Sequence, residues 1–380
     1  MPPDHAWGIE AWRQRARARL PRIVFDYLDG GAEAEIALAD NRTALDRLSL
    51  LPRVLRDVSR PDPATDLLGF RSSMPVAIAP TGINGLLWPD GDLALAAAAA
   101  GAGVAFALST ASNASIDRVA RHGGTPPWFQ LYITERTLAD RLVDLADAAA
   151  CPVLMLTVDV PVGGLRPRDR RNGFGLPLRW TPRLVADLVR HPRWTWSMRA
   201  GTPAFENLNL ALGDADPTRQ AGLLARNMDA SFAWEDLAAL RRRWPRKLVV
   251  KGILHADDAR RALDLGVDGI VVSNHGGRQL DGAPATATVL PEIAAAVGGR
   301  MTLLVDGGIR RGEDVLKLLA LGADGVLLGR ATLYGLAAAG QAGVAAVLES
   351  LRDDLLRGMT LSGAADVGAV KALELRPRRT

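Results

Sequence analysis

The chain has 380 residues, of which 48% are hydrophobic and 23% are charged, a composition typical of folded globular proteins rather than disordered ones. Its single cysteine, Cys151, excludes an intramolecular disulfide and a cysteine-rich zinc cluster. The formal net charge is only +4, with no domain-wide basic block, so no nucleic-acid partner is expected.

The beginning of the chain shows no apolar stretch of signal-peptide length, which predicts that the protein is not secreted. Residues 1–74 are predicted to form a mostly helical extension. The longest uncharged run, residues 93–116, is long enough to span a bilayer. It consists mostly of Ala and Gly and contains polar residues near its end, so we predict a buried helix followed by a buried strand and no transmembrane helix.

Eight short apolar segments, each ending in polar or glycine residues, alternate with helical stretches rich in Ala and Leu. Continuous apolar strands that alternate with helices are typical of a parallel sheet buried on both faces. Eight such units predict an α/β fold, a (β/α)₈ TIM barrel. An open doubly wound sheet is the alternative, and the lack of G-x-G-x-x-G after the first strand weakens it. The predicted strands lie within residues 75–82, 103–110, 127–132, 152–159, 247–252, 269–277, 302–308 and 325–330.

One connection between predicted strands is much longer than the others, because 95 positions separate Val153 from Leu248. The single domain, residues 1–380, therefore divides into a barrel at 75–160 and 247–340 and an insertion at 161–246. The insertion follows the fourth strand, on the face where barrel active sites lie.

Three residues at the predicted strand ends indicate catalysis. Lys251 ends an apolar strand, where an unpaired ammonium group is costly to bury. His275 lies in SNHGGRQLDG (273–282) and suits a general base. Asp159, at another strand end, would fix the tautomer of that base and stabilise its protonated form. The sequence contains no convergent set of His and carboxylate residues, so we predict no metal site.

The last two predicted strands carry a phosphate-site pattern, DGGIRRG (306–312) followed by Gly329 and Arg330. Barrels commonly bind phosphate at this place. The ligand would then present the edge of a polar ring to Gln130, Thr157 and Lys251. FMN fits both ends, and a lysine near N1 of its ring would stabilise anionic reduced flavin.

With these residues, the chain resembles the FMN-dependent (S)-2-hydroxy acid dehydrogenases and oxidases, from FDYLDGGAE (25–33) to GRATLYG (329–335). SNHGGRQLDG is highly specific to that family. PTGINGLLWPDGDLALA (80–96) and MDASFAWEDL (228–237) look most like the membrane-associated (S)-mandelate dehydrogenases, whereas MTLSGA (359–364) looks equally like bacterial L-lactate dehydrogenases.

The resemblance implies a role for each matching position. For catalysis and substrate binding it implies His275 as the base, Asp159 as its partner, Arg278 and Arg166 for the substrate carboxylate, and Tyr27 and Tyr132 for the carboxylate or the 2-oxygen. For FMN it implies Pro80, Thr81, Gly82, Ser109, Gln130, Thr157, Lys251, Ser273, Asp306, Gly307, Gly308, Ile309, Arg310, Gly329 and Arg330.

The implied reaction is oxidation of an (S)-2-hydroxy acid to the 2-oxo acid, with (S)-mandelate and benzoylformate as the favoured pair. An L-lactate dehydrogenase and an oxidase that uses O₂ are the alternatives within the family. Gly82 favours a dehydrogenase by resemblance, and its missing methyl group would leave room for a larger substrate. A Schiff-base aldolase acting through Lys251 is the alternative from a different class. A homo-oligomer, specifically a tetramer, is expected from the family.

Residues 176–207 predict contact with a membrane surface. This segment holds Trp180, Trp194 and Trp196, and its first part has five arginines against one acid, Asp187. Basic and aromatic residues together are typical of interfacial segments. We therefore expect a peripheral protein on the cytoplasmic side of the inner membrane, otherwise cytoplasmic, that passes electrons to a membrane quinone or another acceptor. Packing between subunits, or a lid over the site, is the alternative role of this segment.

Overall fold

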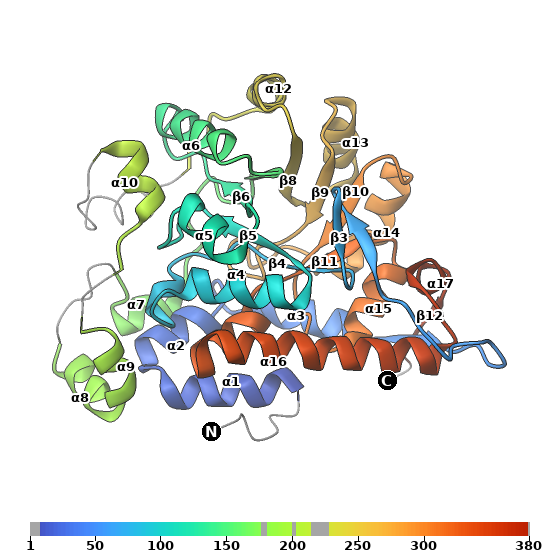
Figure 1. Ribbon diagram of the computed structural model, residues 1–380, viewed down its shortest axis with the longest axis horizontal. Helices are drawn as coiled ribbons and strands as arrows, with labels where there is room; N and C mark the ends of the chain where they lie inside the picture. The colour runs from blue at the N-terminus through green and yellow to red at the C-terminus, as the bar shows by residue number, and fades with distance from the viewer. Residues whose placement is uncertain (1–7, 176–180, 200–202, 214–227, 379–380) are drawn as a thin grey trace.

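The computed structural model describes residues 8–175, 181–199, 203–213 and 228–378. Its centre is a closed barrel of parallel strands in which each strand pairs with the next along the chain and β11 pairs with β4 (Figure 1). The predicted (β/α)₈ barrel is therefore confirmed. The strands are β4 (Val76–Ile78), β5 (Ala105–Ser109), β6 (Trp128–Leu131), β7 (Val153–Thr157), β8 (Lys247–Ile253), β9 (Gly269–Val272), β10 (Thr302–Val305) and β11 (Gly325–Leu328).

Helices connect the strands and cover the outside of the barrel (Figure 1). The long uncharged run contains most of one such helix and the strand after it, as predicted. These helices are α4 (Gly91–Ala102), α5 (Ile116–Gly123), α6 (Arg136–Ala148), α12 (Trp234–Arg243), α13 (Ala256–Asp264), α14 (Thr286–Val297), α15 (Gly312–Ala320) and α16 (Arg330–Ser362).

The barrel interior is filled by alternate strand residues, including Ala77, Met155 and Val249. A hairpin of β2 (Thr65–Leu67) and β3 (Phe70–Ser72) adds Leu67 and Leu68 to this cluster. Both leucines lie against glycines at the N-terminal ends of strands β9 and β11. The hairpin therefore closes that end of the barrel and leaves the C-terminal strand ends for a ligand.

The N-terminal extension contains α1 (Gly8–Arg19), α2 (Arg22–Asp29) and α3 (Ile36–Asp46), as the prediction of a mostly helical segment requires. It also contains three short strands, including β1 (Leu48–Leu51), that the prediction missed. Helix α1 lies along α16 (Figure 1), and β1 pairs antiparallel with β12 (Glu374–Pro377), which follows the short helix α17 (Val367–Lys371). The extension is thus fastened to the C-terminal end of the chain.

By length and composition alone, helix α16 could span a membrane. However, 67% of its most apolar window is buried within the protein. It packs against α1 and α4, and its backbone breaks at Ala339 and Gly340. At Gly340 a Cβ atom would lie 2.5 Å from the Trp88 ring, so the break permits close packing. Burial in the core accounts for the apolar character of this helix.

The insertion after β7 contains α7 (Pro167–Asn172), α8 (Pro182–Arg190), α9 (Pro192–Ser197) and α10 (Glu206–Leu212). Trp194 is buried and donates its indole N–H to the carbonyl of Leu86 at 2.7 Å. The prediction that Trp194 faces a membrane is therefore wrong, because its ring is buried in the protein and its N–H group is already hydrogen-bonded. Trp196 is 71% exposed. Arg179 and Trp180 lie outside the described residues.

Candidate active site

The predicted base and its partner meet across two strand ends. His275 follows β9 and Asp159 follows β7, and the imidazole Nδ1 lies 2.9 Å from the Asp159 Oδ1. Burial opposes ionisation of Asp159, but His275 and Lys251 together hold the pKa of its carboxyl below the usual value. An ionised carboxylate at Nδ1 leaves Nε2 as the atom that can accept a proton.

The backbone at His275 is in the left-handed region, with φ of 55°, and Gly276 and Gly277 continue in it. A Cβ at Gly277 would lie 2.4 Å from the backbone of Leu38, so only glycine fits between this turn and α3. A positive φ is costly for a histidine, and such strain persists where the surroundings fix it. The turn therefore holds the imidazole in one place.

Tyr132 follows β6, and its hydroxyl lies 3.4 Å from the His275 Nε2. Burial, with a further contribution from Asp159, raises the pKa of the Tyr132 phenol. The phenol is therefore neutral at physiological pH and can donate its proton to a substrate oxygen or to the histidine.

Two arginines converge on the ring of Tyr27, which lies on α2. The guanidinium carbons of Arg278 and Arg166 lie 5.2 Å and 5.4 Å from the ring centroid. Phe174 stacks on the same ring, with centroids 4.3 Å apart and planes 9° from parallel. Burial lowers the pKa of Arg278 to about 9, and the neighbouring Arg166 and Arg330 add to this effect. Clustered positive charge of this kind favours binding of an anion.

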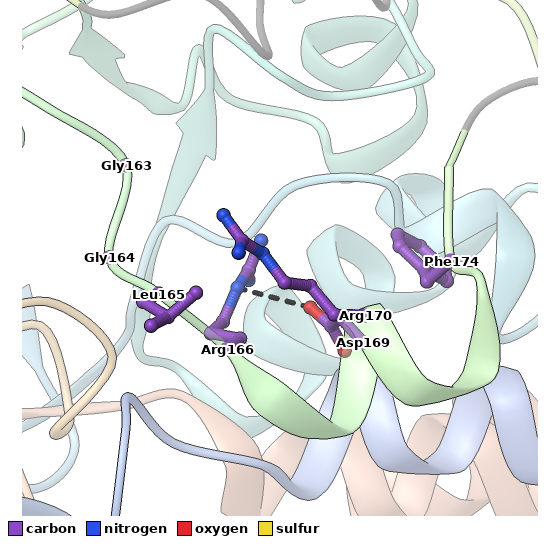
Figure 2. Close-up of a pocket in the computed structure, with 7 residues that line it drawn as sticks. All are labelled: Gly163, Gly164, Leu165, Arg166, Asp169, Arg170 and Phe174. Carbon is purple, nitrogen blue, oxygen red and sulfur yellow. Dashed lines mark ion pairs between the residues drawn. The ribbon is translucent and has the colours of Figure 1, made fainter.

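Arg166 immediately precedes α7, and its guanidinium lies 3.1 Å from the Asp169 carboxylate. Burial raises the pKa of the Asp169 carboxyl, against the effect of Arg166. Figure 2 shows Arg166 and Arg170 extending from α7 into a pocket of about 230 Å³, which Leu165 and Phe174 also line. The pocket places an aromatic and an aliphatic side chain beside the cationic groups.

Lys251 is 4% exposed and lies at the end of β8. Its ammonium group donates to the Ser273 hydroxyl at 2.6 Å and pairs with Asp306 at 3.0 Å. Burial opposes the charge, but Asp306 and Asp159 outweigh it and raise the pKa of Lys251 above its usual value. The ammonium is therefore a fixed positive charge, and Ser273 also accepts the backbone N–H of His275 at 3.0 Å.

Three neutral polar groups line the adjoining strand ends. The Ser109 hydroxyl donates to the Gln130 Oε1 at 2.9 Å across β5 and β6. The amide nitrogen of Gln130 and the hydroxyl of Thr157 are buried without a hydrogen-bond partner among the described residues. Buried polar groups are rarely left unpaired, so these two atoms indicate a bound polar ligand. Together with the Lys251 ammonium, they fit the heteroatom edge of a flavin ring.

The loop after β10 has a glycine-rich backbone compatible with a phosphate site. Gly307 and Gly308 have φ of 103° and 77°. A Cβ at Gly308 would lie 2.3 Å from the Asn41 carbonyl oxygen, so α3 supports the loop from behind. The guanidinium of Arg310 lies 5.4 Å from the Tyr334 ring centroid and donates to the Ile309 carbonyl. The other predicted cofactor residues also lie at this end, Pro80, Thr81 and Gly82 after β4 and Gly329 before α16.

Arg330 also binds backbone carbonyls of the protein itself. Its guanidinium donates to the carbonyls of Leu28, Gly30 and Gly276 at 2.8 to 3.2 Å. Three of its five N–H groups therefore hold α2 against the His275 turn, which leaves two for a phosphate.

Gly82 does not provide the space expected for a larger substrate. A Cβ added there would lie 2.7 Å from the Ala111 Cβ, so the missing methyl group accommodates the loop after β5. The size argument is wrong for this reason.

Sequence reasoning missed several supporting residues. Asn274 exchanges two side-chain hydrogen bonds with Asn41 at 2.8 and 3.0 Å. Asp281 accepts the backbone N–H groups of Ala34 and Ala37. Both polar residues lie inside SNHGGRQLDG, so their presence in the motif was the available signal. The stacking of Phe174 on Tyr27 had no such signal, because the two residues are far apart in sequence.

The chain matches the family model described as FMN-dependent dehydrogenase over residues 16–377. It is 47% identical to (S)-mandelate dehydrogenase of Pseudomonas putida, covering 96% of this chain and 92% of that protein. It is 46% identical to an L-lactate dehydrogenase of Caulobacter vibrioides, covering 97% of both.

Solved structures give the same picture. A crystal structure of monotopic membrane protein (S)-mandelate dehydrogenase superposes with a TM-score of 0.94 at 45% identity, covering 98% of this chain and all of that one. A crystal structure of mandelate oxidase superposes with a TM-score of 0.85 at 41% identity, covering 99% of this chain and all of that one.

Proposed function

Because the chain belongs to the family of FMN-dependent dehydrogenases, we propose that it oxidises (S)-mandelate to benzoylformate. The observation that carries the proposal is the His275–Asp159 pair beside the cationic cluster around Tyr27. A 2-hydroxy acid has the two features that this arrangement needs, a hydroxyl proton to remove and a carboxylate to bind.

FMN, when bound, supplies the two-electron acceptor for the oxidation. Ser109, Gln130 and Thr157 would hold the polar edge of its ring, with the Lys251 ammonium beside them. Its phosphate would lie on the loop after β10 and at the start of α16. The residues proposed to hold FMN are Pro80, Thr81, Gly82, Ser109, Gln130, Thr157, Lys251, Ser273, Asp306, Gly307, Gly308, Ile309, Arg310, Gly329 and Arg330.

His275 would remove the hydroxyl or Cα proton of the substrate through Nε2. Asp159 supports this step, because its carboxylate lies 2.9 Å from Nδ1 and stabilises the imidazolium that forms. The Tyr132 hydroxyl, 3.4 Å from Nε2, would orient the substrate 2-oxygen toward the base.

Arg278 and Arg166 would bind the substrate carboxylate, and Tyr27 would hydrogen-bond it. The depressed pKa of Arg278, about 9, supports this role, because an anion would relieve the repulsion among the clustered cations. A planar guanidinium matches a carboxylate through two parallel hydrogen bonds, which also fixes its orientation.

The preference for mandelate over L-lactate rests on the pocket beside α7. Leu165 and Phe174 line it beside the charged Arg166, Asp169 and Arg170, and these two apolar side chains would suit a phenyl group better than a methyl group. Sequence identity does not separate the two substrates, at 47% and 46%. An aldolase acting through Lys251 is disfavoured, because the raised pKa of that lysine keeps it as an ammonium and not as a nucleophilic amine.

The visible spectrum of the purified protein tests the proposal. We expect flavin absorbance that (S)-mandelate bleaches under anaerobic conditions faster than equimolar L-lactate, with (R)-mandelate as the inactive control. Faster bleaching by L-lactate would show that L-lactate, and not mandelate, is the preferred substrate. A flavin that no 2-hydroxy acid reduces would contradict the proposed reaction.

We also propose that electrons pass to a quinone-type acceptor in a membrane and only slowly to O₂. Val185, Val189 and Trp196 are exposed apolar residues on α8 and α9, beside the exposed Arg190 and Arg193. Co-sedimentation with anionic vesicles should weaken in Trp196→Ser and remain unchanged in Val54→Ser, which alters an exposed valine elsewhere. Equal vesicle binding by both variants would contradict the proposed contact of α8 and α9 with a membrane.

The proposed acceptor is tested separately. Peroxide formation as fast as quinone reduction would contradict the proposal that O₂ is a slow acceptor.

A further inference from the structure

A buried carboxylate outside the proposed site connects two functional segments. Asp92, in the first turn of α4, is 1% exposed. It accepts hydrogen bonds from the Asn84 amide at 2.7 Å and from the backbone N–H groups of Asn113 and Ala114 at 2.7 and 3.2 Å. These donors are neutral and come from the loops after β4 and β5. Burial raises the pKa of Asp92 to about 6, so retaining an acid here costs free energy.

On one side, Asp92 supports the segment predicted to face the flavin, residues 80–82. The same Asn84 amide group donates to the Thr81 carbonyl at 3.0 Å, and the Asn84 Oδ1 accepts from the Thr81 hydroxyl at 3.1 Å. A Cβ at Gly91 would lie 2.5 Å from the Asn84 carbonyl oxygen, so α4 packs directly against this loop. Any shift of Asn84 therefore moves Thr81.

On the other side, Asp92 supports the return of the insertion, residues 203–207. It fixes the backbone of Asn113, whose side-chain amide donates to the carbonyl of Ala204 at 2.9 Å and that of Pro203 at 3.4 Å. The Asn113 Oδ1 accepts the N–H of Gly85 at 2.8 Å. A Cβ at Gly85 would lie 2.7 Å from the Pro203 ring, so the two loops are in close contact.

We propose that Asp92 is a positioning residue that couples the return of the insertion to the flavin-facing loop, so that FMN affinity depends on how the insertion is seated. The inference rests on the proposed FMN site. Asn84 transmits the coupling toward Thr81, and Asn113 transmits it toward Ala204. Neutral side chains of similar size cannot replace Asp92, because its two oxygens accept from donors on both loops.

Asp92→Asn tests the proposal, with Asp66→Asn as the matched control. Asp66 also accepts a backbone N–H, from Gly69 at 2.8 Å, but in the hairpin at the opposite end of the barrel. We expect the FMN dissociation constant to rise about tenfold in Asp92→Asn, the size of effect seen for coupled residues. Hydrogen exchange should accelerate together in residues 80–85 and 203–207 and remain unchanged in β9 and β10. Unchanged affinity, or faster exchange in only one of the two segments, would overturn the proposal.

Asn113→Ala provides an independent test if Asp92→Asn fails to fold. Asn113 contacts the insertion but is not among the proposed FMN residues. We expect its replacement to weaken FMN binding several-fold and to speed exchange at residues 80–82. In the Asp92→Asn background, where that variant folds, it should add no further loss. An Asn113→Ala protein with wild-type FMN affinity and exchange would overturn the coupling. Wild-type protein that binds no FMN would instead contradict the proposed function, and the exchange of the two segments would still test the coupling.

Discussion

The proposed proton-transfer pair and the proposed anion-binding cluster are supported by different parts of the molecule. His275 and Asp159 lie on barrel strand ends and contact each other directly at 2.9 Å. Tyr27 lies on α2 of the N-terminal extension, and Arg166 lies in the insertion, immediately before α7. The barrel therefore carries the proposed chemistry, and the added segments carry most of the proposed recognition. We therefore expect changes in the added segments to alter substrate preference more than proton transfer.

The two regions also differ in charge balance. The carboxyl of Asp159 has a depressed pKa because His275 and Lys251 compensate its burial. Arg278 has a pKa lowered to about 9, because burial and the neighbouring Arg166 and Arg330 all disfavour its charge. The charges of the first region compensate one another, whereas the like charges of the second would be compensated by the proposed substrate carboxylate.

The largest expected effect is on the proton-transfer pair. Replacing His275 by Ala should lower kcat by roughly 10²- to 10⁴-fold, the usual contribution of a general base. The FMN spectrum and dissociation constant should remain close to wild type, because the imidazole is not proposed to hold the cofactor. Steady-state kinetics with a flavin titration would check this, and near-wild-type turnover would remove His275 from the mechanism.

The anion-binding cluster should respond unequally to Arg-to-Lys changes. Arg278→Lys should lower kcat/KM by roughly 30- to 1000-fold, because a buried guanidinium that binds a carboxylate is not replaceable by an ammonium. Arg166→Lys should cost less, since its side chain is 32% exposed and already contacts Asp169. Measuring both variants with the same substrate compares them directly. Equal losses of kcat/KM would contradict the expectation that the buried Arg278 contributes more to carboxylate binding than the partly exposed Arg166.

The support of α2 should appear as acid sensitivity. Burial would raise the pKa of Asp29, but hydrogen bonds from Arg13 and Tyr334 lower it to about 2. A depressed acidic pKa stabilises the fold above the unfolded value of 3.8, and this contribution is lost as pH falls toward 2. Asp29→Asn should therefore cost about 2 kcal/mol in free energy of unfolding at pH 7 and flatten the pH dependence below pH 4.

Urea unfolding between pH 7 and pH 2.5 would measure that difference, with Asp144→Asn as the control. Asp144 makes an exposed ion pair with Arg243, so its loss should change stability little. A pH dependence that is identical in wild type and Asp29→Asn would contradict the assignment.

The smallest expected effect concerns the stacking that holds the Tyr27 ring. Phe174→Leu keeps an apolar side chain but removes the stacked contact, worth about 1 kcal/mol. The KM for the hydroxy acid should rise several-fold, while the primary isotope effect on kcat remains unchanged. A loss confined to kcat would instead place Phe174 in the chemical step.

Much of the barrel was predictable because local pattern and tertiary role coincide there. Each central strand is a continuous apolar run, and a residue such as Lys251 stands out at the end of one. Parallel strands bring their carboxyl ends to one side, so His275 and Asp159 could be expected to meet although they are 116 positions apart. The three extra strands of the N-terminal extension were missed because each has only three or four residues, too few to show an alternation of apolar and polar residues. In addition, β1 pairs with β12 at the other end of the chain, which no local pattern indicates.

Side-chain orientation in the added segments could not be predicted. Trp194 and Trp196 are two residues apart in the same helix, yet one is 3% exposed and the other 71%. Composition does not distinguish them, whereas in the structure Trp194 is buried and donates a hydrogen bond to the Leu86 carbonyl. Gly82 likewise suggested open space, whereas the loop carrying Ala111 fills it.

The sequence by itself determined the barrel, the polar strand ends and the identity of the proposed base, because strand periodicity and residue chemistry are local properties. Only the tertiary structure decided that Arg330 holds backbone carbonyls, that Lys251 pairs with Asp306, and that Asp92 accepts hydrogen bonds from the loops after β4 and β5. These depend on which distant backbone groups reach hydrogen-bond distance, and no local pattern in the chain encodes that distance.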